Sequence, residues 1–218
     1  ISLGLVGSEM CIRDRDKAIP EPGVMHEVER FFYVAHEAII RWGGTPAWDK
    51  APEELGLKVL ARHEAAARNL MAQFKIPQRF ALLAPVARGL HHGKVKAWAH
   101  FNELCKPLRD MGIEPIIFPA AREVEENRKA CPDATILEPT TLGNYAALAK
   151  QAQIVIANDS GVSHVAAAVQ AKQITLVGVT EIERTRPWNK DARVLGDAKS
   201  GWASVDEVVK TIHEILGA

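Results

Sequence analysis

The chain has 218 residues, of which 47% are hydrophobic and 25% are charged, so it can bury a core and accommodate one domain with an appendage. Lysine plus arginine and aspartate plus glutamate number 27 each, so no net basic field favours nucleic acid or an anionic membrane as a partner. No stretch of the sequence approaches the roughly 20 apolar residues that span a bilayer.

Residues 1–15 differ in character from the rest of the sequence. They begin with Ile1 rather than Met and resemble a translated sequencing adapter, so we expect an artefact or a disordered end. They also lack the basic start and the small-residue cleavage site of a signal peptide. The fold prediction therefore begins after them.

Two helices are predicted first. Apolar residues at helical spacing predict a helix over 25–42, and Gly43, Gly44 and Pro46 end it. A second apolar stripe predicts a helix over 53–74. The segment between the two helices is typical of a linker.

From residue 80 onward, short apolar runs alternate with amphipathic helices. The predicted strands are 80–85, 114–118, 135–137, 154–157 and 174–177, and the predicted helices are 98–111, 122–130, 142–152, 162–169 and 205–216. Ser204 and Glu207 form a capping-box pattern at the start of the last helix. Because near-continuous apolar strands alternate with helices, residues 54–218 are predicted to form one α/β domain with a Rossmann-like, doubly wound parallel sheet. In such a sheet, ligands bind at the carboxyl ends of the strands.

The loop from Asn158 to His164 is the strongest candidate site. A buried strand passes through a small polar turn directly into an alanine-rich helix. Gly161 permits close approach of a ligand to the backbone, and the free N–H groups at a helix start bind anions. Ser160 and Ser163 add hydroxyl donors, whereas Asp159 would repel phosphate and suits ligand hydroxyls or the shape of the turn. An ordinary capped helix start is the alternative.

A basic segment follows the strand at 80–85. Arg88, Lys94 and Lys96 suit a pyrophosphate, and a solvated basic loop is the alternative. No metal is expected at the His91-His92 pair, because no carboxylate or cysteine lies near it in the sequence. The cysteines, Cys11, Cys105 and Cys131, also lack zinc or redox spacing.

Two further loops follow predicted strands. Glu123 lies just after the strand at 114–118, where a carboxylate can hold ribose hydroxyls, whereas Glu125 and Glu126 are interpreted as favourable charges at a helix start. The loop over 178–189 could fold over a ligand, and on its own it is typical of a surface loop.

The order of these motifs resembles the family 9 glycosyltransferases, the lipopolysaccharide heptosyltransferases. The motifs are Lys96-Ala97-Trp98, Glu123, the run from Asp159 to Ala168, Gly178-Val179-Thr180 and Pro187-Trp188, and the resemblance covers about residues 25–216. It implies the two-Rossmann (GT-B) architecture, in which 54–218 is the C-terminal nucleotide-sugar domain and 16–53 is a remnant of the N-terminal domain with the interdomain helix. The short C-terminal tail favours the heptosyltransferase I type.

The resemblance also assigns roles to single residues. It places Lys96 at the donor phosphates, Glu123 at the adenosine ribose, Ser160 and Gly161 at the pyrophosphate, Asp159 at the strand end, His164 near the sugar and Thr180 in the last loop. The sequence departs from the family pattern at Val86, Ala99 and Phe118-Pro119, which reduces backbone freedom near the phosphates or the ribose.

The implied reaction is inverting, metal-independent transfer of a heptose or related sugar from an ADP-sugar to the lipopolysaccharide core. No cofactor is expected. The general base is expected in an N-terminal domain that this chain lacks, so the chain should bind donor and transfer little alone. The implied partners are a nucleotide sugar and a lipid-linked oligosaccharide acceptor. A cytoplasmic monomer is expected, with peripheral contact at the inner face of the inner membrane.

Two other functions compete with this interpretation. One is an enzyme that uses a UDP-sugar, such as an epimerase, since the loops do not select the base. The other is a degenerate, non-catalytic nucleotide-binding module, which the departures at Val86 and Pro119 favour. A nucleic-acid function is disfavoured by the zero net charge and by an aromatic content of only 6%.

Overall fold

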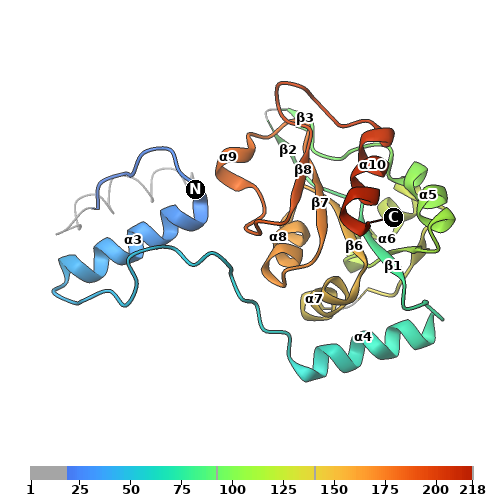
Figure 1. Cartoon of the computed structure of the whole chain (residues 1–218), viewed down its shortest axis with the longest axis horizontal. Helices are drawn as coiled ribbons and strands as arrows, with labels where there is room; N and C mark the ends of the chain where they lie inside the picture. The colour runs from blue at the N-terminus through green and yellow to red at the C-terminus, as the bar shows by residue number, and fades with distance from the viewer. Residues whose placement is uncertain (1–18, 92, 140, 218) are drawn as a thin grey trace, which may run out of the picture. The chain divides into compact units, whose positions relative to one another are not determined.

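The computed structural model describes residues 19–217 with gaps at 92 and 140. These residues fall into two units, one ending at Pro52 and the other beginning at Glu53 (Figure 1). The artefact expected at residues 1–15 lies outside the described range.

The first unit contains helix α3 (Glu27–Arg41), as the apolar spacing predicts. His26 caps its start, because the Nδ1 atom accepts a hydrogen bond from the backbone N–H of Val28 at 3.2 Å. The Glu29 carboxylate accepts in return from the backbone N–H of His26 at 3.2 Å. None of the side chains of α3 is buried, so the helix is held by its own hydrogen bonds and end charges rather than by a core.

A six-stranded parallel sheet organises the second unit, with the spatial order β5-β4-β1-β6-β7-β8. The strands are β1 (Phe80–Ala84), β4 (Glu114–Ile117), β5 (Thr135–Ile136), β6 (Ile154–Asn158), β7 (Gln173–Leu176) and β8 (Arg193–Leu195). Counted along the chain, this is the strand order of the Rossmann fold. The chain builds one half of the sheet outward from β1 and the other half outward from β6. The topological switch point therefore lies between β1 and β6, where ligands are expected.

Helices cover both faces of the sheet (Figure 1). On one face, α5 (Cys105–Asp110) and α10 (Val205–Leu216) enclose a core that includes Leu83. On the other face, α4 (Ala61–Gln73), α7 (Leu142–Gln151) and α8 (Gly161–Ala168) enclose a second core that includes Leu82. Neighbouring residues of β1 thus supply opposite cores, as the two-residue period of a strand requires. The predicted doubly wound α/β domain is confirmed.

The remaining elements are short. They are β2 (Leu90–His91) and β3 (Lys94–Val95), which form an antiparallel hairpin, α6 (Val124–Ala130), α9 (Ile182–Thr185), and the 3₁₀ turns η1 (Phe101–Leu104) and η2 (Ala121–Glu123). The predicted capping residue of α10 is confirmed, since Ser204 Oγ accepts from the backbone N–H of Glu207 at 3.2 Å.

Several predicted boundaries are wrong. The helix predicted over 53–74 begins only at Ala61. Before it, in residues 55–60, the backbone N–H of Leu57 donates to the carbonyl of Ala168 at 2.9 Å rather than to a carbonyl of its own helix. Gly56, at φ +60°, lies in that segment and lowers its helix propensity. Strand β8, the hairpin β2–β3 and helix α9 are absent from the sequence prediction. Their charged residues hide the apolar alternation that identifies the central strands.

Two cysteines that are far apart in the sequence meet in the core. The Sγ atoms of Cys105 and Cys131 lie 3.4 Å apart, and both side chains are buried as free thiols. Within the described ranges, no three His, Cys, Asp or Glu side chains cluster in a way that could hold a metal ion. Over the same ranges, no helix is long and apolar enough to cross a membrane.

Candidate functional site

Asn158, the last residue of β6, joins the two sides of the switch point. Its side chain is fully buried, and its Nδ2 donates to the carbonyl of Pro85 at 2.7 Å and to that of Ala84 at 3.4 Å. Its Oδ1 accepts from the backbone N–H of Trp98 at 2.9 Å. One side chain therefore fixes the ends of β1 and β6 and the segment that carries Trp98.

The Asp159 carboxylate lies at the centre of the predicted site residues. Its Oδ2 accepts from Thr180 Oγ1 at 2.9 Å and forms an ion pair with Lys96 Nζ at 3.3 Å. The Nε2 atom of His164 lies 4.0 Å from Oδ1. Only 12% of the Asp159 side chain is exposed. Side chains from two loops, Lys96 and Thr180, thus converge on this group together with His164 of α8, and Lys96 balances its charge.

The start of α8 faces the same region. Ser160 is the N-cap residue, and Ser163 Oγ donates to the Ser160 carbonyl at 2.7 Å. A Cβ atom built on Gly161 would meet no other atom within 4 Å, so packing within the chain does not require glycine here. The first-turn N–H groups and the positive end of the helix dipole are the features by which helix starts bind anions, so the predicted anion site is in the expected place.

Six of the seven predicted site residues line one cleft of about 640 Å³, which we call the polar cleft. They are Lys96, Asp159, Ser160, Gly161, His164 and Thr180. Arg184 of α9 also lines the cleft, and the sequence analysis did not select it. The loop that was expected to fold over a ligand thus contributes Thr180 and Arg184 to its wall.

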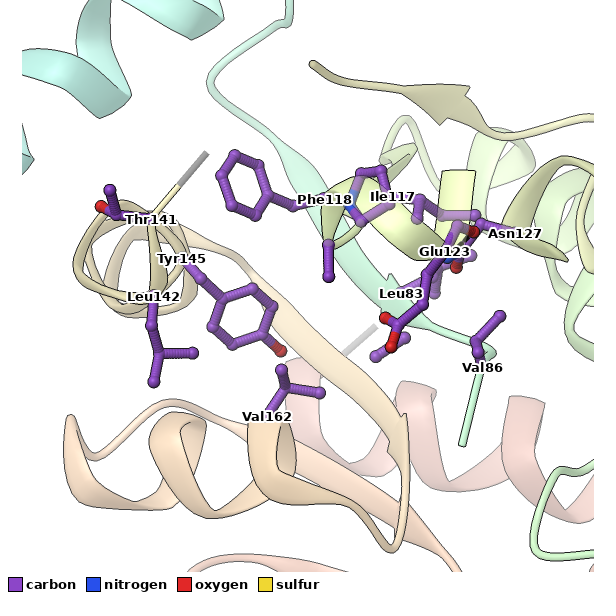
Figure 2. A pocket seen from close by; sticks show the side chains of 13 residues that line it. Leu83, Val86, Ile117, Phe118, Glu123, Asn127, Thr141, Leu142, Tyr145 and Val162 are labelled. Atoms are coloured by element: carbon purple, nitrogen blue, oxygen red, sulfur yellow. Dashed lines mark hydrogen bonds between the residues drawn. The ribbon is translucent and has the colours of Figure 1, made fainter. Parts of the chain in front are cut away.

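The seventh predicted residue, Glu123, lies in a separate pocket of about 180 Å³, which we call the apolar pocket (Figure 2). Its walls are mainly hydrophobic side chains from β1, β4, α7 and the start of α8. Val86 and Pro119, which depart from the family pattern, are part of that wall, whereas Ala99 is not. The Glu123 side chain is 22% exposed at its edge.

The basic segment after β1 does not act as one cluster. Arg88 is held by the Glu126 carboxylate, at 2.7 Å and 3.1 Å, and by the carbonyl of Arg122 at 2.5 Å. Lys94 is exposed on the hairpin, so Lys96 is the member of the segment that reaches the polar cleft. Of the three cations predicted to suit a pyrophosphate, Arg88 is engaged by α6 and Lys94 does not line the polar cleft, so the prediction remains for Lys96 alone. His92 lies outside the described residues, so the expectation that the His91-His92 pair holds no metal stays a prediction.

The same two segments of the chain line both pockets. Gly161 lines the polar cleft while its neighbour Val162 lines the apolar pocket, so the first turn of α8 stands between them. The segment after β1 likewise begins at the apolar pocket with Val86 and ends at the polar cleft with Lys96. An elongated ligand with an apolar ring at one end and an anionic group at the other fits this arrangement. The fold and the site thus define a Rossmann-like domain of the nucleotide-binding class.

Comparison with known proteins identifies the family. The profile of Glycosyltransferase family 9 (heptosyltransferase) matches residues 4–211, and the chain belongs to this family. The chain is 28% identical over 156 residues to lipopolysaccharide heptosyltransferase 2 of Escherichia coli K12, covering 60% of the chain and 44% of the relative. It is 25% identical over 219 residues to the protein of the same name from Salmonella typhimurium LT2, covering 87% and 61% respectively. The chain thus spans about half the length of these curated relatives.

Solved structures show the same fold. The structure of E. coli ADP-heptose LPS heptosyltransferase II aligns with a TM-score of 0.67 at 24% identity, over 92% of this chain and 64% of that one. E. coli heptosyltransferase WaaC with ADP aligns with a TM-score of 0.65 at 20% identity, over 92% and 60%. The predicted family, fold and glycosyltransferase class are confirmed. The preference for type I stays a prediction, since both curated relatives above are named heptosyltransferase 2.

Proposed function

We propose that the unit from Glu53 onward binds the nucleotide-sugar donor of a heptosyltransferase, with ADP-heptose as the donor and the lipopolysaccharide core as the acceptor. The observation that carries the proposal is the pair of pockets that the first turn of α8 lines, with Gly161 in the polar cleft and Val162 in the apolar pocket. The printed names of the relatives, which include ADP-heptose and lipopolysaccharide, support the choice of substrates.

The nucleoside is proposed to occupy the apolar pocket. Its hydrophobic walls suit the apolar faces of a base, whereas a charged phosphate would lose its hydration there without compensation. Glu123 lies at the edge of the pocket, where a carboxylate can accept hydrogen bonds from both ribose hydroxyls. The ribose would then direct the 5′ substituent toward the first turn of α8.

The diphosphate is proposed to lie at the start of α8, in the polar cleft. The N–H groups of the first turn and the Lys96 ammonium supply its positive environment. Asp159 holds Lys96 through the ion pair at 3.3 Å, and Thr180 donates to the same carboxylate oxygen at 2.9 Å. The proximity of Asp159 to a diphosphate is tolerable because Lys96 already neutralises the carboxylate.

These groups define how the domain would assist transfer. When the bond between the sugar and the diphosphate breaks, negative charge grows on the leaving phosphate oxygen. Lys96 and the α8 N–H groups are already directed at that region, so they stabilise the leaving group electrostatically. We further propose that transfer is metal-independent and inverting and that it uses no cofactor. His164, which lines the cleft with 43% of its side chain exposed, is proposed to contact the sugar.

Deprotonation of the acceptor is proposed to require a carboxylate from outside this chain. Asp159 is engaged by Lys96 and Thr180, which makes it a poor base for an acceptor hydroxyl. The full-length relatives are longer than this chain, and their additional domain is the proposed source. The acceptor is proposed to be lipid-linked and approached by a monomer at the cytoplasmic face of the inner membrane.

Calorimetric titration of the chain with ADP and with UDP tests the proposal. Lys96→Ala removes the cation in the cleft, whereas Lys94→Ala removes the same charge two residues away on the exposed hairpin. We expect saturable ADP binding, weakened at least tenfold by Lys96→Ala and little changed by Lys94→Ala. Stronger binding of UDP would favour a UDP-sugar enzyme, and binding of neither nucleotide would favour a degenerate module. Equal loss in both variants would contradict the assignment of Lys96.

A further inference from the structure

Tyr145 projects from α7 into the apolar pocket. Its side chain is only 2% exposed, and its ring lies 6.2 Å from that of Phe118, centre to centre. In Figure 2 the ring points away from α7 into the space that the lining residues surround, with its hydroxyl end near Val162. The phenol is therefore part of the pocket floor rather than of the outer surface of the helix.

The hydroxyl of Tyr145 has no hydrogen-bond partner within the described part of the chain. A buried, unpaired hydroxyl destabilises a folded protein, and a phenylalanine would fill the same space without that penalty. Burial also raises the pKa of Tyr145, so the hydroxyl keeps its proton at neutral pH and is able to donate.

Other polar groups of the pocket are already engaged by the backbone. Thr141 Oγ1 accepts from the backbone N–H of Asn144 at 3.3 Å, as the N-cap of α7. Asn127 Nδ2 donates to the Glu123 carbonyl at 2.7 Å. Thr141 keeps its own O–H donor, but the residue is exposed, whereas the Tyr145 hydroxyl is buried in the pocket and has no partner among the described residues.

We propose that the Tyr145 hydroxyl donates a hydrogen bond to a ring nitrogen of the donor's nucleobase and thereby determines which bases the site accepts. This inference rests on the proposed function, which places the base in the apolar pocket. A ring nitrogen is an acceptor that fits between apolar walls, and it would satisfy the phenol on binding. A base without an acceptor at that position would leave the hydroxyl unpaired, as it is in the free protein, so it would not gain that hydrogen bond and would bind more weakly.

The test is Tyr145→Phe in the full chain, with Tyr33→Phe in α3 as the matched control. We expect Tyr145→Phe to weaken ADP binding about tenfold, the value of one neutral hydrogen bond. Binding of ribose 5-phosphate should not change, because it lacks the base. The unfolding temperature of the free protein should stay the same or rise, since the variant removes an unpaired hydroxyl. Tyr33→Phe should leave ADP binding unchanged.

Deaza analogues of ADP identify the partner atom. Replacing ring nitrogen 1, 3 or 7 by CH should weaken binding to the unaltered chain for one of the three analogues. That same analogue should lose nothing further in Tyr145→Phe, because the bond is already gone. If Lys96→Ala impairs ADP binding and Tyr145→Phe does not, the inference is overturned and the proposed function stands. If the unaltered chain binds no nucleotide, both are overturned.

Discussion

Replacement of Asn158 by leucine tests whether the switch point is held together by one side chain. Leucine has a similar size, so the main loss is the set of hydrogen bonds to Pro85 and Ala84 and from Trp98. The bonds at 2.7 Å and 2.9 Å are the short ones, and their partners would be left buried. Each unsatisfied partner costs about 1–3 kcal/mol, so the loss of these two bonds in Asn158→Leu should destabilise the domain by about 2–6 kcal/mol. That is a large part of the about 5–15 kcal/mol that stabilises a typical domain.

Urea unfolding followed by tryptophan fluorescence measures this loss. The midpoint should fall while the dependence of the unfolding free energy on urea stays the same, since the surface that unfolds is unchanged. Asn189→Leu is the matched control, because Asn189 is also buried but donates to the carbonyl of Ala171 away from the β1–β6 junction. Both variants should be destabilised, yet only Asn158→Leu should also weaken ADP binding. A loss below about 1 kcal/mol for Asn158→Leu would refute the reasoning.

Three further substitutions probe the site and its support. Thr180→Val keeps the shape but removes the hydrogen bond to Asp159, so ADP binding measured by calorimetry should weaken about fivefold, corresponding to about 1 kcal/mol. Gly161→Ala should leave thermal stability unchanged or slightly raised, because the added methyl meets nothing within 4 Å. It should weaken ADP binding measured by calorimetry, since the methyl occupies the approach to the helix start. Unchanged binding would argue against a phosphate there. Gly178→Ala should lower stability by about 1–3 kcal/mol in urea unfolding, because its methyl would lie 2.2 Å from the Trp202 ring. No loss of stability would mean that the ring moves to make room for the methyl without cost.

The sequence predicts the central strands well because each is a nearly continuous apolar run. β1 and β6 are buried at all five positions, which leaves little doubt about their type. Strand β8 could not be found in this way, because it is short, starts with the exposed Arg193 and is only partly buried. Residues 55–60 carry leucines at spacings that also suit a helix, and the bond from Leu57 to Ala168 is a tertiary contact that no local pattern contains.

The sequence predicts those site residues that are close together along the chain. It does not predict contacts between residues that meet only in the folded structure. The run from Asp159 to His164 predicts a strand end followed by a helix start from neighbouring residues alone. The contacts of Asn158 join residues 60 to 74 positions apart, so its structural role cannot be read from its neighbours. Tyr145 lies in an alanine-rich helix and is typical there of a core residue. Only its place in the pocket and its unpaired hydroxyl distinguish it.

The ion pair of Lys96 with Asp159 has a consequence for substitutions at the aspartate. A flexible lysine loses rotamer freedom when it binds a ligand, at about 0.5–1.5 kcal/mol for a long side chain. In this chain Asp159, which also accepts a hydrogen bond from Thr180, restricts the ammonium within the fold itself, with 25% of the Lys96 side chain exposed. Removal of the Asp159 carboxylate would make the cleft more positive. It would also give the Lys96 side chain more rotamer freedom. Nucleotide affinity in such a variant would therefore reflect two opposing changes, a gain in charge and a loss of order.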